Sequence, residues 1–292
     1  MANLTAIDSS ISNLIHTQGS SDSDIAAGEV AIVGAGCGDI DLMTIKAAKV
    51  VAQAEALVFD SLVNSDILSL ANSDCERHFV GKRCGQPSYK QDDINALLYK
   101  LALEGKKVVR LKGGDPHIFG RGAEEALYLA KKNIKSQFVA GITAAIGCAS
   151  STGIPLTYRG MARSVSLITG TRMTDPDFDK AAKQWQALIH AESTLVFYMG
   201  KEQAQSISTG LLMAGCDRDL PVAFVTNGGR ASQIVTQSTV EQMAKVAKKI
   251  ISSGPTLIII GEVVSVGMQL NNLLEGIPPF SDEYQLNEQA YA

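Results

Sequence analysis

The sequence predicts an α/β protein made of two α/β domains. Short apolar stretches alternate with segments of helical periodicity, the order expected of sheets that are covered by helices. The chain has 292 residues, of which 46% are hydrophobic and 19% charged, so it can bury one large core or two modest ones. Glycine-rich turns follow apolar stretches at the strand ends where open α/β sheets bind ligands. We therefore expect two α/β units with a ligand site.

In the first half, the expected strands are residues 29–33, 56–59 and 107–111. A helix over residues 41–54 joins the first two strands in the βαβ order of a parallel sheet. A second helix is predicted to begin at a capping box of Ser88 and Gln91 and to end at Gly105. Its apolar face is formed by Ile94, Leu97, Leu98 and Leu101.

In the second half, the expected strands are residues 164–168, 194–198, 222–225 and 256–260, and the expected helices are residues 179–189 and 240–250. The junction between the two domains is predicted at Val139-Ala140-Gly141-Ile142-Thr143, where a strand ends in a glycine turn. The predicted organisation is a disordered leader at 1–28, domains at 29–141 and 142–270, and a flexible tail at 271–292.

Composition narrows the function classes. A formal charge of -4 gives no global attraction to nucleic acid or anionic membranes, so a basic site has to be local. No stretch is long enough for a membrane span, and the leader has neither the apolar segment of a secretory signal nor the basic residues of a transit peptide. The cysteines contain no C-x-x-C pair, which disfavours a zinc site and a disulfide framework and suits a reducing cytoplasm. They are Cys37, Cys75, Cys84, Cys148 and Cys216.

The first glycine motif is Gly34-Ala35-Gly36-Cys37-Gly38-Asp39. It resembles a dinucleotide fingerprint, but that fingerprint needs a small residue at the position of Asp39, and a carboxylate there would repel a pyrophosphate. Two interpretations remain open. The motif is either a binding loop or a tight turn in which Asp39 caps the following helix.

The second motif lies in the run from Val108 to Glu125, which leaves a strand and starts a helix. Its turn, Gly113-Gly114-Asp115-Pro116, lacks the Gly-Lys-Ser/Thr ending of a phosphate-binding P-loop, so a neutral or cationic ligand is easier to accommodate. Asp115 could bind a ribose or face a positive centre. Alternatively, it caps the turn before Pro116.

Taken together, the motifs resemble the tetrapyrrole (precorrin) methyltransferases, which use S-adenosylmethionine. The resemblance runs from about Glu29 to Val266. Within the family, the chain is most similar to the uroporphyrinogen-III branch in two segments, Lys82-Arg83 and the run from Arg110 to Glu125. Other matching motifs are Asp60-Ser61-Leu62-Val63, Gly141-Ile142-Thr143-Ala144, Gly153-Ile154-Pro155-Leu156-Thr157, Val196-Phe197-Tyr198-Met199-Gly200 and Gly261-Glu262-Val263-Val264.

The resemblance implies two αβα domains with the cofactor in the cleft between them, in a homodimer. It also explains why neither glycine motif matches a phosphate-binding loop, because S-adenosylmethionine has a positive sulfonium and no phosphate. Carried over by position, the expected cofactor-binding residues are Cys37, Gly113, Gly114, Asp115, Ile118, Thr143, Ala144, Met199 and Gly228.

The resemblance further implies a proton acceptor at Asp60 and a proton donor at Lys82. Without it, Asp60 is better explained as a turn residue before Ser61, and Lys82 and Arg83 as a solvated pair. The implied reaction methylates uroporphyrinogen III at C2 and C7, giving precorrin-2 and S-adenosylhomocysteine for sirohaem or cobalamin biosynthesis. The residues before Glu29 are too few for a dehydrogenase or ferrochelatase unit, and no metal cluster is indicated.

A substrate rich in carboxylates calls for a local basic rim, and arginines can hold carboxylates through two hydrogen bonds. Each candidate could equally be a solvated surface charge. Besides Lys82, the candidates are Arg83, Lys112, Arg121, Arg159 and Arg163.

Four positions depart from the pattern of the family. Cys37 and Ala140 replace prolines, and His117 and Ala123 replace an aromatic residue and a glycine. The lost prolines should loosen two loops and either weaken the cofactor fit or alter product inhibition. His117 is interpreted as a partly exposed loop imidazole.

Three alternative functions remain. The protein could be another tetrapyrrole methyltransferase, acting for example on precorrin-2 or precorrin-4. It could be an NAD-dependent dehydrogenase, which Asp39 disfavours, or a non-catalytic module that binds the cofactor.

Overall fold

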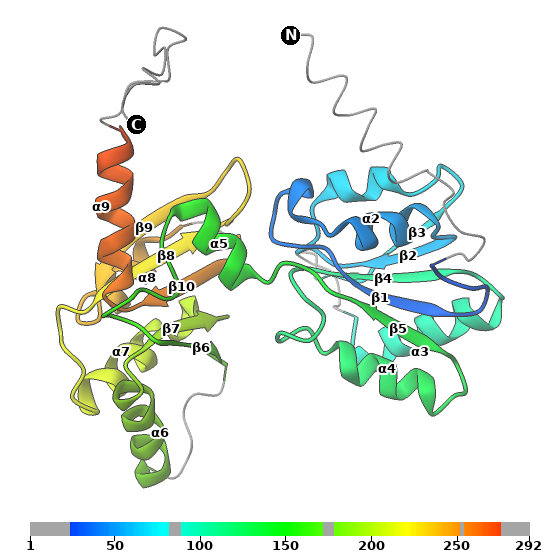
Figure 1. The fold of residues 1–292 in the computed structure, drawn as a ribbon. Coiled ribbons are helices and arrows are strands. Elements are labelled where there is room, and N and C mark those ends of the chain that lie inside the picture. The colour runs from blue at the N-terminus through cyan, green and yellow to red at the C-terminus, as the bar shows by residue number, and fades with distance from the viewer. Residues whose placement is uncertain (1–23, 82–88, 172–177, 252–253, 276–292) are drawn as a thin grey trace, which may run out of the picture.

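The computed structural model describes residues 24–81, 89–171, 178–251 and 254–275, which form two five-stranded sheets with helices packed on both faces of each (Figure 1). The prediction of an α/β fold is confirmed. The first sheet ends with Val139 and the first strand of the second sheet begins at Ser164. The domain boundary between residues 141 and 142 stays a prediction that agrees with this division.

The first sheet is parallel throughout, in the order β3-β2-β4-β1-β5. Val33 pairs with both Leu111 and Val139, so the central strands end at the same edge. All five positions of β1 and of β4 are buried, as expected of parallel strands covered on both faces. The strands are β1 (Val30–Gly34), β2 (Ala56–Phe59), β3 (Glu76–Phe79), β4 (Val108–Lys112) and β5 (Ser136–Val139).

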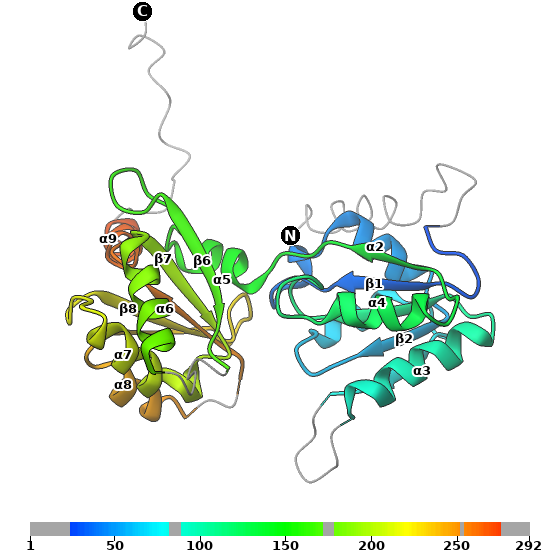
Figure 2. The ribbon, with the colours of Figure 1, turned by 90° about the horizontal axis from the view of Figure 1, so that it is seen from below.

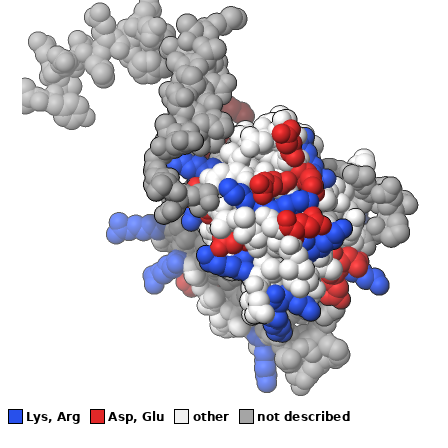
Figure 3. All heavy atoms as spheres, turned by 90° about the vertical axis from the view of Figure 1, so that its right-hand side faces the viewer, with Lys and Arg blue, Asp and Glu red and all other residues white. Residues whose placement is uncertain are grey.

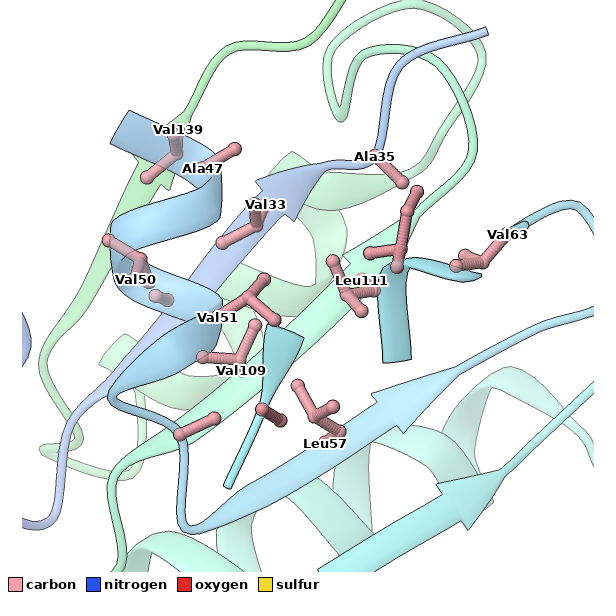
Figure 4. Packing of buried hydrophobic residues seen from close by; sticks show 14 of the residues in the cluster. Val33, Ala35, Ala47, Val50, Val51, Leu57, Val63, Val109, Leu111 and Val139 are labelled. Atoms are coloured by element: carbon pink, nitrogen blue, oxygen red, sulfur yellow. The ribbon is translucent and has the colours of Figure 1, made fainter. Parts of the chain in front are cut away.

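Helices cover the first sheet on opposite faces (Figure 2). One face packs Val33, Leu57 and Leu111 against the helix of Val50 and Val51, a cluster shown in Figure 4. The other face packs against α3 and α4. The helical elements are η1 (Ile40–Leu42), α2 (Ile45–Ala52), η2 (Ser65–Leu70), α3 (Gln91–Leu103) and α4 (Gly122–Ala130).

The second sheet is mixed, in the order β6-β7-β10-β8-β9, and only β6 and β7 run parallel. Its strands are β6 (Ser164–Thr169), β7 (Ser193–Tyr198), β8 (Pro221–Thr226), β9 (Ile234–Thr239) and β10 (Thr256–Ile260). Its helical elements are α5 (Ala144–Thr152), α6 (Phe178–His190), η3 (Lys201–Gln203), α7 (Ala204–Met213), α8 (Met243–Lys249) and α9 (Val263–Glu275).

Most predicted strands lie within one or two residues of the observed ones, but three helix predictions are wrong in detail. The helix predicted over 240–250 is shorter, because α8 begins only at Met243 and ends at Lys249. The predicted helix over 41–54 divides into η1 and α2, because Thr44 accepts a hydrogen bond from Ala47 N at 3.1 Å and starts a new helix. The capping box of Ser88 and Gln91 is also wrong. Helix α3 begins at Gln91, and Ser88 lies outside the described residues.

Both predicted ends of the ordered chain need correction as well. Residues 24–28 were expected to belong to the disordered leader, but Ile25 is buried in the first core. Residues 271–275 were expected in the tail, but they form the last turn of α9. The apolar contacts of Ile25 and the periodicity of α9 extend the folded part in both directions.

Three loop backbones meet at the carboxyl edge of the first sheet. Gly36 and Gly114 exchange two backbone hydrogen bonds, with N–O distances of 3.2 and 2.8 Å. A Cβ atom on Gly34 would lie 2.6 Å from both the Gly114 carbonyl oxygen and the Gly141 nitrogen. The loops after β1, β4 and β5 therefore approach each other more closely than any side chain at Gly34 would permit.

We predict that Gly34→Ala destabilises the fold by about 3 kcal/mol, because the backbone lies on both sides of the new methyl group and cannot move away. Urea unfolding followed by circular dichroism measures the effect. Gly105→Ala is the control, since open space surrounds Gly105 and the change should cost about 1 kcal/mol from its left-handed backbone alone. Equal losses in the two variants would refute the close packing at Gly34.

Candidate functional site

A cleft of about 470 Å³ lies between the two sheets. Its volume is in the range of small-molecule sites. The loops after β1, β2 and β4 form one wall, and the start of α5 and the ends of β7 and β8 form the other. All nine predicted cofactor-binding residues line it, as do Asp60, Arg110, Lys112, Phe119, Arg121, Tyr198 and Arg230.

The first glycine motif forms the capped turn that the sequence left open, and its role as a binding loop stays a prediction. Asp39 accepts a hydrogen bond from Asp41 N at 3.0 Å and caps η1, which confirms the turn interpretation. Gly36, Cys37 and Gly38 line the cleft. The motif is therefore a capped turn whose backbone also faces the cleft.

Asp115 likewise has a structural role in a ligand-accessible position. Its Oδ1 accepts a hydrogen bond from His117 N at 2.8 Å, which confirms the predicted turn cap, and its Oδ2 accepts one from Gly141 N at 3.0 Å. The side chain lines the cleft. Asp115 thus joins the loops after β4 and β5 and leaves a carboxylate at the cleft wall.

Four charged side chains are joined by ion pairs, and three of them, Asp60, Arg110 and Lys112, line the cleft. Arg110, which is 4% exposed, donates from Nη2 to Asp60 Oδ2 at 3.2 Å and from Nε to Glu125 Oε1 at 3.3 Å. Lys112 Nζ donates to the same Glu125 oxygen at 2.8 Å. Glu125 is fully buried, and two cations balance two carboxylates. We call these residues the charge network.

The charge network places Lys112 differently from the open basic rim that the sequence suggested. Its ammonium is buried on Glu125. Burial lowers the pKa of Lys112, and the charge of Arg110 lowers it further, whereas the Glu125 carboxylate acts in the opposite direction. Whether Lys112 also binds a substrate stays a prediction.

Asp60 has a fixed orientation. Its Oδ1 accepts a hydrogen bond from Leu62 N at 3.0 Å, which confirms the turn interpretation, while Oδ2 receives the Arg110 guanidinium. The carboxylate lines the cleft, so a role as proton acceptor is compatible with this position. Lys82 and Arg83 lie outside the described residues.

On the second wall, Tyr198 organises the start of α5. Its hydroxyl lies 2.7 Å from Thr143 Oγ1 and accepts a hydrogen bond from Ala145 N at 2.9 Å. It therefore serves as the cap that the Thr143 side chain does not provide. Burial raises the pKa of Tyr198, so the hydroxyl keeps its proton at neutral pH. The ring of Phe119, from the β4 loop, lies 5.0 Å from the Tyr198 ring across the cleft.

The remaining basic candidates do not meet at one place. Arg121 lines the cleft and forms two hydrogen bonds to Glu124, at 3.0 and 2.6 Å. Arg159 and Arg163 line a separate surface depression with Thr157 and Tyr158. On the face of the molecule in Figure 3, basic and acidic side chains alternate without a patch of one sign.

Sequence reasoning missed Glu125, Tyr198 and Arg230 as contributors to the site. The signal for Glu125 was present, because Arg110 and Lys112 are two cations within a buried strand and require a buried anion. No pattern in the sequence indicates that Arg230 belongs to the site. Its Nη2 donates a hydrogen bond to Leu62 O at 2.9 Å. His117 is exposed and lies 4.3 Å from the ring of Phe138, in agreement with its interpretation as a loop imidazole.

The residues that the structure describes contain no candidate metal centre and no candidate membrane span. Within them, no cluster of three or more His, Cys, Asp or Glu side chains could hold a metal ion. None of their helices is long and apolar enough to cross a membrane.

Comparison with known families gives one extensive match. The model of the tetrapyrrole (corrin/porphyrin) methylases matches residues 29–244. Siroheme synthase from Enterobacter sp. (strain 638) is 46% identical over 244 residues, which are 84% of this chain and 52% of that protein. The chain thus spans about half the length of the curated relatives it matches.

Solved structures are similar over most of the chain. Uroporphyrin III C-methyl transferase from Thermus thermophilus is 34% identical with a TM-score of 0.67, and the match covers 82% of this chain and 99% of that one. A second structure of that enzyme is complexed with S-adenyl homocysteine. A cobalt precorrin-4 methyltransferase shares the fold. It is 23% identical, with a TM-score of 0.71, and the match covers 81% of this chain and 96% of that one.

We predict that Glu125→Gln lowers the stability of the fold by about 3 kcal/mol, because it leaves two buried cations with one carboxylate. The neighbouring Glu124→Gln is the matched control and should leave the unfolding midpoint nearly unchanged, since Glu124 is exposed. Urea unfolding of both variants provides the measurement. If the two midpoints shift equally, the charge network does not stabilise the fold.

Proposed function

Because the chain belongs to the tetrapyrrole (corrin/porphyrin) methylase family, we propose that it transfers methyl groups from S-adenosylmethionine to carbon atoms of uroporphyrinogen III. The observation that carries the proposal is the convergence of all nine family cofactor positions and of Asp60 on one cleft. The 34% identity to the Thermus thermophilus enzyme supports uroporphyrinogen III as the substrate.

The cleft fits this methyl donor. Gly113 and Gly114 place peptide backbone at the wall, and the Asp115 carboxylate adds a negative charge suited to a cationic ligand without phosphates. Thr143, Ala144, Met199 and Gly228 would hold the ligand from the opposite wall, with Cys37 and Ile118 nearby. When bound, S-adenosylmethionine supplies an electrophilic methyl group on a positively charged sulfur.

The charge network would hold Asp60 in place to accept a proton from the substrate. Asp60 is held by Leu62 N and Arg110, so its carboxylate faces the cleft in one orientation and can accept the proton that a methylated pyrrole ring releases. Lys82 is the proposed proton donor. Arg110 is a positioning residue, because it touches Asp60 and is itself fixed by Glu125 and by the Leu111 carbonyl at 2.7 Å.

Alignment is the main contribution that the two walls would make. An electron-rich pyrrole carbon needs no covalent catalyst, so holding donor and acceptor in line can supply about 7–11 kcal/mol of barrier reduction. We propose two successive methylations, at C2 and C7, which give precorrin-2. Formation of a homodimer and location in the cytoplasm are further parts of this proposal.

Purified protein incubated with uroporphyrinogen III and isotope-labelled S-adenosylmethionine should give a doubly methylated product, detected by mass spectrometry. A product with a single methyl group would contradict the second methylation. Binding of the donor without any methyl transfer would instead favour a cofactor-binding module, and transfer only to precorrin-2 or precorrin-4 would favour another tetrapyrrole methyltransferase.

Asp60→Asn should lower kcat by about 10²–10⁴-fold, because the amide cannot accept the proton. Its effect on the dissociation constant of S-adenosylhomocysteine should be small. Asp66→Asn, a change of the same chemistry at an exposed side chain in η2, should leave kcat unchanged. An Asp60→Asn enzyme with the activity of the original protein would exclude Asp60 as the proton acceptor.

Tyr198→Phe should weaken S-adenosylhomocysteine binding by about 10-fold, since it removes the hydroxyl that holds Thr143 and caps α5. Isothermal titration calorimetry measures the effect. Tyr158→Phe, at an exposed tyrosine outside the cleft, is the matched control. Unchanged affinity in Tyr198→Phe would show that the start of α5 does not hold the ligand.

A further inference from the structure

Two cysteine thiols meet in the cleft although they come from different domains. Cys37 follows β1 in the first glycine motif, and Cys148 lies on α5. Both line the cleft and are 7% and 2% exposed. Both belong to the same buried cluster of side chains, which joins residues of the two domains.

The backbones around the two thiols are tightly packed. A Cβ atom on Gly147 would lie 2.3 Å from Cys37 Cβ and 2.8 Å from its Sγ, so the residue next to Cys148 already touches Cys37. Cys37 Sγ, as a thiol, donates to the Gly228 carbonyl at 3.5 Å, and a Cβ atom on Gly228 would lie 2.3 Å from Cys148 Sγ. Both sulfurs therefore converge on Gly228.

The two thiols differ in acidity. The hydrogen bond from Cys148 lowers the pKa of Cys37, and the positive charge of Arg230 lowers it further, against the effect of burial. Cys148 has a raised pKa because of the same hydrogen bond and its burial. The more acidic Cys37 is therefore suited to be the nucleophilic cysteine and Cys148 the resolving one.

We propose that Cys37 and Cys148 are an oxidisable dithiol site, at which a peroxide forms a disulfide that closes the cleft to the methyl donor. The Cys37 thiolate attacks hydrogen peroxide, giving a sulfenic acid and hydroxide. The Cys148 thiol then attacks the sulfenic sulfur, forming the disulfide and releasing water. Two thiols are oxidised and one peroxide is reduced, so no other reactant is needed.

The position of the disulfide gives it a functional consequence. It would tie the loop after β1 to α5, which follows Thr143 directly, across the space expected to hold the donor. A bound donor covers both sulfurs and should protect them. The identity of the excluded ligand rests on the proposed function, whereas formation of the disulfide does not.

Peroxide treatment of the intact protein tests the chemistry without any ligand. After oxidation and alkylation of the remaining thiols, mass spectrometry of the digest should find Cys37 linked to Cys148, and a reductant should reverse the link. Cys148→Ser should abolish this link, while Cys75→Ser and Cys216→Ser, at cysteines outside the cleft, should retain it. Oxidation without this crosslink in the original protein would overturn the proposal.

Ligand binding tests the consequence. The disulfide form should bind S-adenosylhomocysteine at least about 10-fold more weakly than the reduced form, and saturating S-adenosylhomocysteine should slow formation of the crosslink. Equal binding by both forms would refute closure of the cleft. If the reduced protein fails to bind S-adenosylhomocysteine at all, the proposed function fails, and the crosslink still decides whether the dithiol site exists.

Discussion

The site depends on the close approach of three loop backbones at the carboxyl edge of the first sheet. Gly34 leaves room for the Gly114 carbonyl and the Gly141 amide, and Asp115 fastens the last contact by accepting the Gly141 N–H. Parallel pairing alone brings the strand ends to one edge. The absence of side chains at these glycines then lets the loops form a continuous wall, so the cleft is a consequence of backbone packing.

A second constraint lies beneath that wall. Arg110 and Lys112 occupy a strand that is buried on both faces, so each cation needs a partner inside the protein. Glu125 supplies it from α4, the helix that begins after the glycine loop, and Asp60 completes the balance at the surface of the cleft. The same ion pairs that satisfy buried charges thereby fix the carboxylate proposed to accept protons.

The sequence predicted the features that depend on local pattern. Apolar strands such as Thr256–Ile260 and the glycine loops were identified because burial and turns constrain neighbouring residues directly. Strands β3 and β9 were missed because neither has a buried apolar face, and the antiparallel pairing of β10 is set by tertiary contacts. The capping of α5 by Tyr198 joins residues more than fifty positions apart, and no local signal specifies it.

A crystal structure with S-adenosylhomocysteine tests the central claim most directly, because that claim concerns where the methyl donor lies. We predict ligand density in the cleft between the Gly113-Gly114 turn and the start of α5 at Thr143 and Ala144, with both sulfurs of Cys37 and Cys148 covered. Ligand density in the surface depression of Arg159 and Arg163, with the cleft filled by solvent, would contradict the account.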